Sequence, residues 1–149
     1  MTDVTGRSAE IRIDPVSDKR GRAAFVDLGR AFSDRLPHFV PQIRSEQIEL
    51  VNPDKNPFFG HARVQLFMAS RGGQPVGRIS AHIDELALAM PADQGFGPGT
   101  GFFGYFDAED EDVARAHPFT GTGLHLQMQE APCDYSKGNR FEGGAPSTQ

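Results

Sequence analysis

Residues 62–83 have the sequence ARVQLFMASRGGQPVGRISAHI, and their pattern sets the architecture around them. In the first half, apolar and polar side chains alternate with the period of two that a half-buried strand requires. Gly72 and Gly73 lie at the centre, where a tight turn between antiparallel strands favours glycine. The alternation then resumes in the second half. The segment therefore predicts a β-hairpin with strands over 62–70 and 75–83.

Two helices are predicted before the hairpin. Ser17 or Asp18 is placed to cap a helix that runs to about Arg35, because apolar residues recur at helical spacing along it. Leu36–Pro41 cannot continue this helix, since prolines lack an amide donor and favour extended geometry in the residue before them. After this ordered turn, a second and shorter helix is expected over 43–51.

Two more strands are predicted at the ends of this unit. Glu10–Pro15 alternates like a short strand, and Gly101–Phe106 is aromatic on both faces, which is typical of a central strand. Five acidic residues between Asp107 and Asp112 favour the start of a helix, because carboxylates stabilise the positive end of a helix dipole. From His117 onward no sustained period appears. The chain is thus divided into a flexible N-terminus (1–9), one folded domain (10–116) and a low-order tail (117–149).

Composition excludes several classes of protein. A chain of 149 residues has room for one domain, and a net charge of −5 argues against sequence-independent binding of nucleic acid. The single cysteine, Cys133, predicts a reducing compartment without disulfides. No signal peptide and no apolar span of about 20 residues is visible, so a cytoplasmic protein without a membrane partner is expected.

No metal site is predicted either. His61 and His82 fall on neighbouring strands of the hairpin, but they lack a third ligand at a defined spacing. The acidic segment 107–112 lacks the turn glycine and the alternation of a calcium loop. Paired histidines and a solvated helix start are the interpretations that we prefer.

Three segments are more specific than the order of the elements: Asn56–His61 (NPFFGH), Pro75–Ala81 (PVGRISA) and Gly101–Asp110 (GFFGYFDAED). Together with that order, they resemble the N-terminal half of the GCN5-related N-acetyltransferase (GNAT) superfamily, in a bacterial branch. The resemblance covers about Ile11 to Ala116.

This resemblance implies an α/β fold of the acyl-CoA N-acyltransferase type, with a mixed, mostly antiparallel sheet and flanking helices. The long helix, fifth strand and loop that follow the acidic segment in that branch are not recognisable here. Helical periodicity is lost at Pro118, and a low-complexity tail follows. The fold is therefore expected to be incomplete, with its C-terminal part missing or frameshifted and the tail disordered.

The resemblance also implies transfer of an acetyl group from acetyl-CoA to an amine of a small molecule or peptide. By position, the donor would contact the end of the fourth strand at Gly104, Tyr105, Phe106 and Asp107. The superfamily places its pyrophosphate signature next, where this chain has the carboxylates of 107–112. Like charges repel by about 1 kcal/mol for a close pair even in water, so weak CoA binding and an inactive, truncated enzyme are expected.

Few residues are candidates for the remaining roles. Phe58 and Phe59 are candidates for an acceptor pocket, with a plug that seals the edge of the sheet as the alternative. By residue type, the general base that deprotonates an amine would be Glu85, His82 or Glu109.

A second function, from a different class, is a non-catalytic binding module. Without a fifth strand, the fourth strand would leave amides unpaired at an open edge. It would also expose the apolar surface of its aromatic residues, Phe102, Phe103, Tyr105 and Phe106. The protein would then self-associate through this edge.

Overall fold

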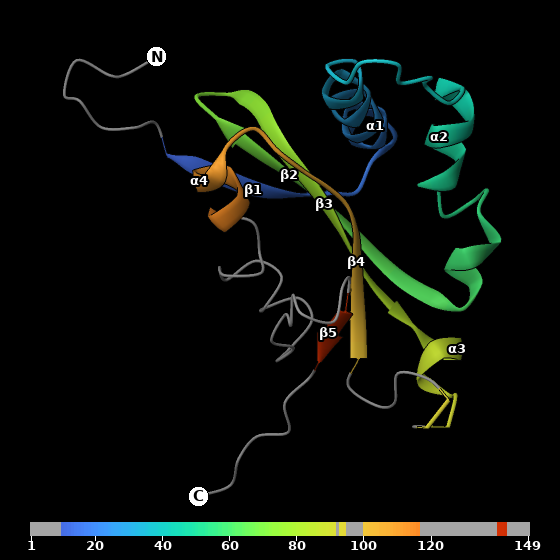
Figure 1. The fold of residues 1–149 in the computed structure, drawn as a ribbon. Coiled ribbons are helices and arrows are strands. Elements are labelled where there is room, and N and C mark those ends of the chain that lie inside the picture. The colour runs from blue at the N-terminus through green and yellow to red at the C-terminus, as the bar shows by residue number, and fades with distance from the viewer. Residues whose placement is uncertain (1–9, 92, 95–99, 117–139, 143–149) are drawn as a thin grey trace, which may run out of the picture.

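A computed structural model of the chain describes residues 10–91, 93–94, 100–116 and 140–142. These residues form one sheet with the strand order β1-β2-β3-β4-β5, and all four pairings are antiparallel (Figure 1). The strands are β1 (Ile11–Val16), β2 (Ala62–Arg71), β3 (Gln74–Asp84), β4 (Thr100–Ala108) and β5 (Arg140–Glu142).

Helices lie on both faces of this sheet (Figure 1). One face is covered by α1 and α2, and α4 lies on the other. The helical elements are α1 (Lys19–Ser33), α2 (Arg44–Leu50), the 3-10 helix η1 (Pro57–Gly60), α3 (Glu85–Leu88) and α4 (Glu111–Ala116). Asp18 caps α1, since its carboxylate accepts a hydrogen bond of 2.6 Å from the Gly21 amide.

Each face has its own apolar core. On the face of α1 and α2, buried side chains from both helices and from β2 pack together: Phe25, Val26, Val51 and Leu66. On the face of α4, Val113 is fully buried against Ala69 and Val76 of the hairpin. Burial of these apolar side chains fixes both helix layers on the sheet.

The predicted hairpin is confirmed. The strands β2 and β3 pair from Ala62–Asp84 to Arg71–Gln74, and Gly72 and Gly73 adopt φ values of 56° and 79° at the turn. The two helices before it and the helix start after the acidic run also form where the patterns place them.

Several expectations differ from the structure. The expected mixed sheet is antiparallel in every pairing that is described, because short connections join neighbouring strands without a crossover. The predicted loop at 56–60 contains η1, whose first turn Asn56 caps, and the loop after β3 begins with α3. The α/β class itself is confirmed.

The edge of β4 is not fully open. β5 pairs with Thr100, Gly101 and Phe102, so part of the edge for which self-association is predicted is covered. β5 also falls within the tail predicted to be disordered. The other residues of 117–149, Cys133 among them, and residues 1–9 lie outside the described residues.

A bulge interrupts the pairing of β3 with β4. Arg78 lies opposite Asp107 and Ser80 lies opposite Gly104, so β4 has one more residue than β3 across this step. Tyr105 lies in the bulge with φ of 49°, a conformation that non-glycine residues rarely adopt. The bulge therefore places the Tyr105 ring on the face covered by α1.

No helix among the described residues is long and apolar enough to cross a bilayer.

Candidate functional site

A small cavity lies between η1, the end of α2 and the sheet. Its volume is about 90 Å³. Most of its wall is apolar, and the polar groups come from three elements. The lining residues are Leu50, Val51, Asn56, Phe58, Phe59, Val64, Leu66, His82 and Tyr105.

His82 is the titratable residue in this wall, and its partner is Ser80. Both project from the same face of β3, and the Ser80 Oγ lies 2.6 Å from the His82 Nε2. Ser80 is fully buried. Burial lowers the pKa of the His82 imidazole from its usual 6.5, and the charge of Asp84 opposes this shift only in part. His82 is therefore neutral at pH 7.

The neutral imidazole has a definite chemical capacity. When Nε2 carries the proton, it donates to Ser80 Oγ, and Nδ1 is left with a free lone pair. An imidazole in this tautomer accepts a proton from a group bound in the cavity, and its lowered pKa keeps it in the basic form at neutral pH.

Phe58 lies between two histidine rings. Its ring centroid is 5.1 Å from that of His61 and 5.8 Å from that of His82. His61 Nδ1 is 3.0 Å from the Asp84 carboxylate, which also caps α3. Burial alone would raise the pKa of Asp84, but hydrogen bonds from His61 and from two backbone amides lower it on balance.

Asn56 holds η1 in place over the cavity. Its side-chain amide donates to the Leu50 carbonyl at 2.7 Å, and its side-chain oxygen accepts from the Phe58 amide at 3.0 Å. These two bonds tie the end of α2 to the start of η1. The position of Phe58 is thus set by a side chain rather than by a regular strand or helix.

A second cluster lies beside the cavity, around the guanidinium of Arg78. It donates to the Asp107 carboxylate at 2.7 Å and to the Phe25 carbonyl at 3.0 Å. Its Cζ also lies 4.9 Å from the ring centroid of Phe25 and 5.3 Å from that of Tyr105. A Cβ on Gly29 would lie 1.9 Å from this Cζ, so α1 approaches closely only because it has glycine there.

The acidic run has structural partners. The Asp110 carboxylate forms two bonds with Arg71, at 2.7 and 2.9 Å, and accepts one from the Val113 amide at the start of α4. The hydrogen bond from Arg71, and then that from Val113, lowers the pKa of Asp110 to about 2. The amide end of α4 is thus engaged by the protein's own carboxylate, and it does not fit the pyrophosphate cradle expected after the fourth strand.

The predicted site residues have different places. Phe58, Phe59 and Tyr105 meet at the cavity wall, and the backbone of Gly104 lies against Ser80. Phe106 and Asp107 do not line the cavity, and the Asp107 carboxylate is bonded to Arg78. Their proposed roles in donor binding stay predictions.

Of the predicted bases, His82 lines the cavity, whereas Glu85 and Glu109 are exposed. The sequence analysis missed Ser80 and Asn56. A signal for Ser80 was present, because it shares a strand face with His82 on a strand that two helices cover. Among the described residues, no group of three or more His, Cys, Asp or Glu is placed to hold a metal ion.

Comparison with known proteins gives three relatives. The chain is 67% identical over 55 residues to the "ATP synthase subunits region ORF 1" of Fuscovulum blasticum, a match that covers 34% of this chain and 80% of the relative. It is 38% identical over 104 residues to a bacterial ceramide synthase of Caulobacter vibrioides (strain NA1000 / CB15N), covering 70% of this chain and 26% of the relative. Protein YghO of Escherichia coli (strain K12) is 32% identical over 114 residues, covering 76% and 28%. The chain thus spans about a quarter of the length of these last two relatives.

No family model and no solved structure matches the chain. The resemblance to the GNAT superfamily is therefore wrong as a statement of family, because none of the relatives is a GNAT acetyltransferase. It rested on the order of strands and helices and on three short segments, and unrelated functions share such arrangements. One relative is named as a ceramide synthase.

Proposed function

Because the chain belongs to the same family as the ATP synthase subunits region ORF 1 of Fuscovulum blasticum and is similar to a bacterial ceramide synthase, we propose that it takes part in acyl transfer to a lipid amine. A ceramide is an amide of a long-chain amine, so its synthesis joins an acyl group to nitrogen. The observation that carries the proposal is the neutral His82 in the wall of an apolar cavity.

In the proposed reaction, His82 is the general base. The amine nitrogen forms a bond to the acyl carbon, the donor's leaving group departs with its electron pair, and the amine proton moves to His82 Nδ1. Ser80 keeps the imidazole in the required tautomer by accepting from Nε2 at 2.6 Å. The apolar wall formed by Phe58 and Phe59 keeps water away from the reacting atoms.

The size of the cavity supports a short acyl group. A volume of about 90 Å³ corresponds to about three water-sized units of ~30 Å³ each, which is the size of an acetyl group. We therefore keep acetyl-CoA as the proposed donor, with its acetyl end at the cavity. The amide end of α4 is left out of this proposal, because Asp110 engages it.

A larger groove supports an acceptor with a long chain. It has a volume of about 560 Å³ and shares Leu50 and Asn56 with the small cavity. Apolar side chains of Pro41, Ile43 and Pro57 line it together with the carboxylates of α2. An alkyl chain gains about 0.8 kcal/mol for each CH2 group that it buries in such a groove.

Nuclear magnetic resonance of the histidine side chains tests the site in the full chain. Acetyl-CoA is expected to shift the imidazole signals of His82 with saturation, whereas those of the exposed His38 stay unchanged and serve as the internal control. Free CoA, which lacks the acetyl group, is expected to shift His82 less. Equal shifts at His82 and His38, or none at either, would contradict the proposed donor site.

A further inference from the structure

The connection between α1 and α2 has an unusual concentration of exposed apolar side chains. Nine large hydrophobic residues are exposed in the part of the chain that the structure describes, and four of them fall within residues 36–43. We call these residues the α1–α2 ridge. The exposed fractions are 59% for Leu36, 42% for Phe39, 84% for Val40 and 61% for Ile43.

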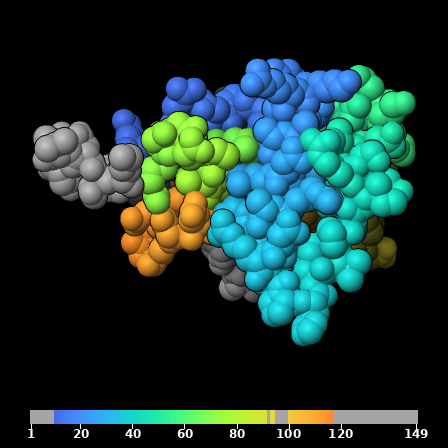
Figure 2. Space-filling view, turned by 90° about the horizontal axis from the view of Figure 1, so that it is seen from above, coloured from blue at the N-terminus to red at the C-terminus, as the bar shows by residue number. Residues whose placement is uncertain are grey.

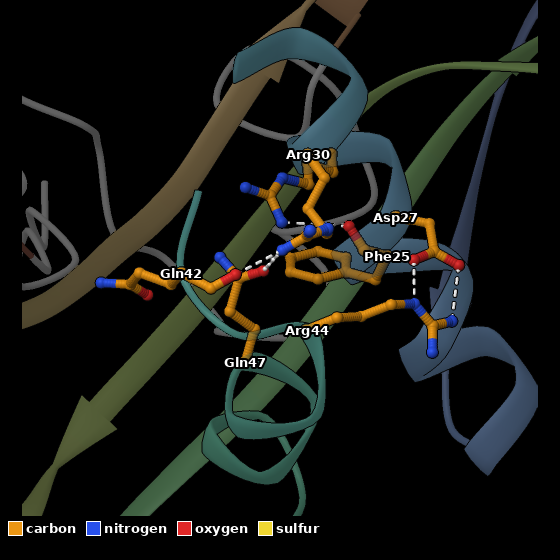
Figure 3. Close-up of polar contacts among 7 residues, drawn as sticks. Phe25, Asp27, Arg30, Gln42, Arg44 and Gln47 are labelled. Carbon is orange, nitrogen blue, oxygen red and sulfur yellow. Dashed lines mark hydrogen bonds and ion pairs between the residues drawn. The ribbon is translucent and has the colours of Figure 1, made fainter. Parts of the chain in front are cut away.

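The ridge is held at its base by polar contacts (Figure 3). Arg30 of α1 donates to the Gln42 carbonyl at 2.6 Å and to the Gln47 side-chain oxygen at 3.0 Å. Arg44 of α2 forms two bonds to the Asp27 carboxylate, at 2.6 and 2.8 Å. These contacts close the connection from both helices, so its apolar side chains are presented outward by a defined structure.

The shape of the ridge is also set by its own residues. Pro37 and Pro41 restrict the backbone on each side of His38, which adopts φ of 64°. Every residue from 34 to 46 is exposed. Figure 2 shows this cyan segment projecting at the edge of the molecule. The apolar side chains therefore meet the surroundings first when this edge approaches another surface.

The charges around the ridge are of one sign. The chain has 20 acidic residues and a net charge of −5, yet residues 35–45 contain none, and an arginine lies at each end of the ridge. The Arg44 charge is paired with Asp27. The guanidinium of Arg35 lies 4.7 Å from the ring centroid of Phe32 and forms no salt bridge among the described residues. The rim of the ridge is therefore cationic.

From these observations we propose that the α1–α2 ridge docks on an anionic lipid bilayer, with Val40 and Phe39 inserted at the level of the head groups. A stable protein interface takes about 800 Å² and some 20–30 residues from each partner, far more than four side chains on a narrow turn supply. A bilayer interface needs only a few apolar side chains and an attraction to anionic lipid, which Arg35 provides.

This surface differs from the expectation of no membrane partner, which rested on the absence of a spanning segment. Pro41 and Ile43 belong both to the ridge and to the wall of the 560 Å³ groove. A lipid amine that leaves the bilayer at the ridge would therefore reach the groove directly. Only this consequence rests on the proposed function, because docking itself needs no acyl transfer.

Co-sedimentation of the full chain with phosphatidylcholine vesicles that contain about 30% phosphatidylglycerol tests the docking. We expect the wild type to bind and Val40→Asp to bind at least about tenfold more weakly, since it puts a charge at the head-group level. Leu86→Asp is the matched control, because Leu86 is 60% exposed on α3, away from the ridge, and should leave binding within about twofold of the wild type. Circular dichroism checks that both variants fold.

Absence of wild-type binding, or equal loss in both variants, would overturn the proposal. So would a wild-type dimer, seen by light scattering without vesicles, that Val40→Asp dissociates, because a second copy of the chain would then occupy the ridge. None of these readouts depends on acyl transfer, so failure of the docking and failure of the proposed function are separate results.

Discussion

Arg78 joins more parts of the molecule than any other side chain described above. Its side chain is only 13% exposed, and it bonds β4 through Asp107 and α1 through the Phe25 carbonyl. A charge so far removed from water is tolerated only because each of its contacts is satisfied. The neighbouring Tyr105 ring, which lines the cavity, is therefore held by a network that begins at α1.

Replacement of Gly29 by alanine tests this network. The added Cβ would meet the Arg78 Cζ at 1.9 Å and displace the guanidinium from its partners, at a cost of about 2 kcal/mol in unfolding free energy. Gly60→Ala is the matched control, because a Cβ there meets nothing within 4 Å. Urea unfolding of both variants measures the effect, and equal stabilities would contradict this role of Gly29.

Among the elements, α4 depends on one carboxylate. Asp110 caps it and bonds Arg71 of β2, and these contacts lower the pKa of Asp110 to about 2. The unfolded chain takes up this proton near pH 4, before the folded protein does. The stability that Asp110 contributes is thus present above pH 4 and is lost as the pH falls toward 2.

Asp110→Asn is expected to unfold at lower urea concentration at pH 6 and to lose less stability than the wild type between pH 4 and pH 2. Urea midpoints measured across this range give the comparison. Asp112→Asn, which removes an exposed carboxylate of the same helix turn, should keep the wild-type slope. An unchanged slope in Asp110→Asn would show that its contact with Arg71 does not stabilise the fold.

Local patterns predicted the elements well, because their period reflects which side each face buries. The hairpin, α1 and α2 form where alternation and helical spacing place them. The bulge at Tyr105 and the contact of Ser80 with His82 depend on the register between β3 and β4, which no local pattern encodes. The close approach at Gly29 likewise depends on how α1 packs on the sheet.

The candidate site was predicted in part for the same reason. Phe58, Phe59 and Tyr105 were selected as aromatic residues near strand ends, and the fold brings them to one wall. The family assignment was wrong because element order alone does not identify a family. Self-association through β4 stays a prediction, with the edge now reduced by the pairing of β5 at Thr100–Phe102.

For the molecule as a whole, the proposed function requires the cavity, the groove and the neutral His82 to act together. The cavity holds the acyl end, the groove holds the chain of the amine, and Asn56 forms part of the wall between them. His82 lies in the wall of the cavity, where burial lowers its pKa. Acyl transfer to a long-chain amine is thus the reaction that joins these features.

The most direct test is mass spectrometry of the product formed when the full chain is incubated with acetyl-CoA and dodecylamine at pH 7.5. We expect N-dodecylacetamide to form with the wild type, and at least about 100-fold more slowly with His82→Gln, since a general base contributes about 10²–10⁴ to the rate. His38→Gln, at an exposed position, should form it at the wild-type rate. Absence of the amide, or equal rates with His82→Gln and the wild type, would contradict acyl transfer at this site.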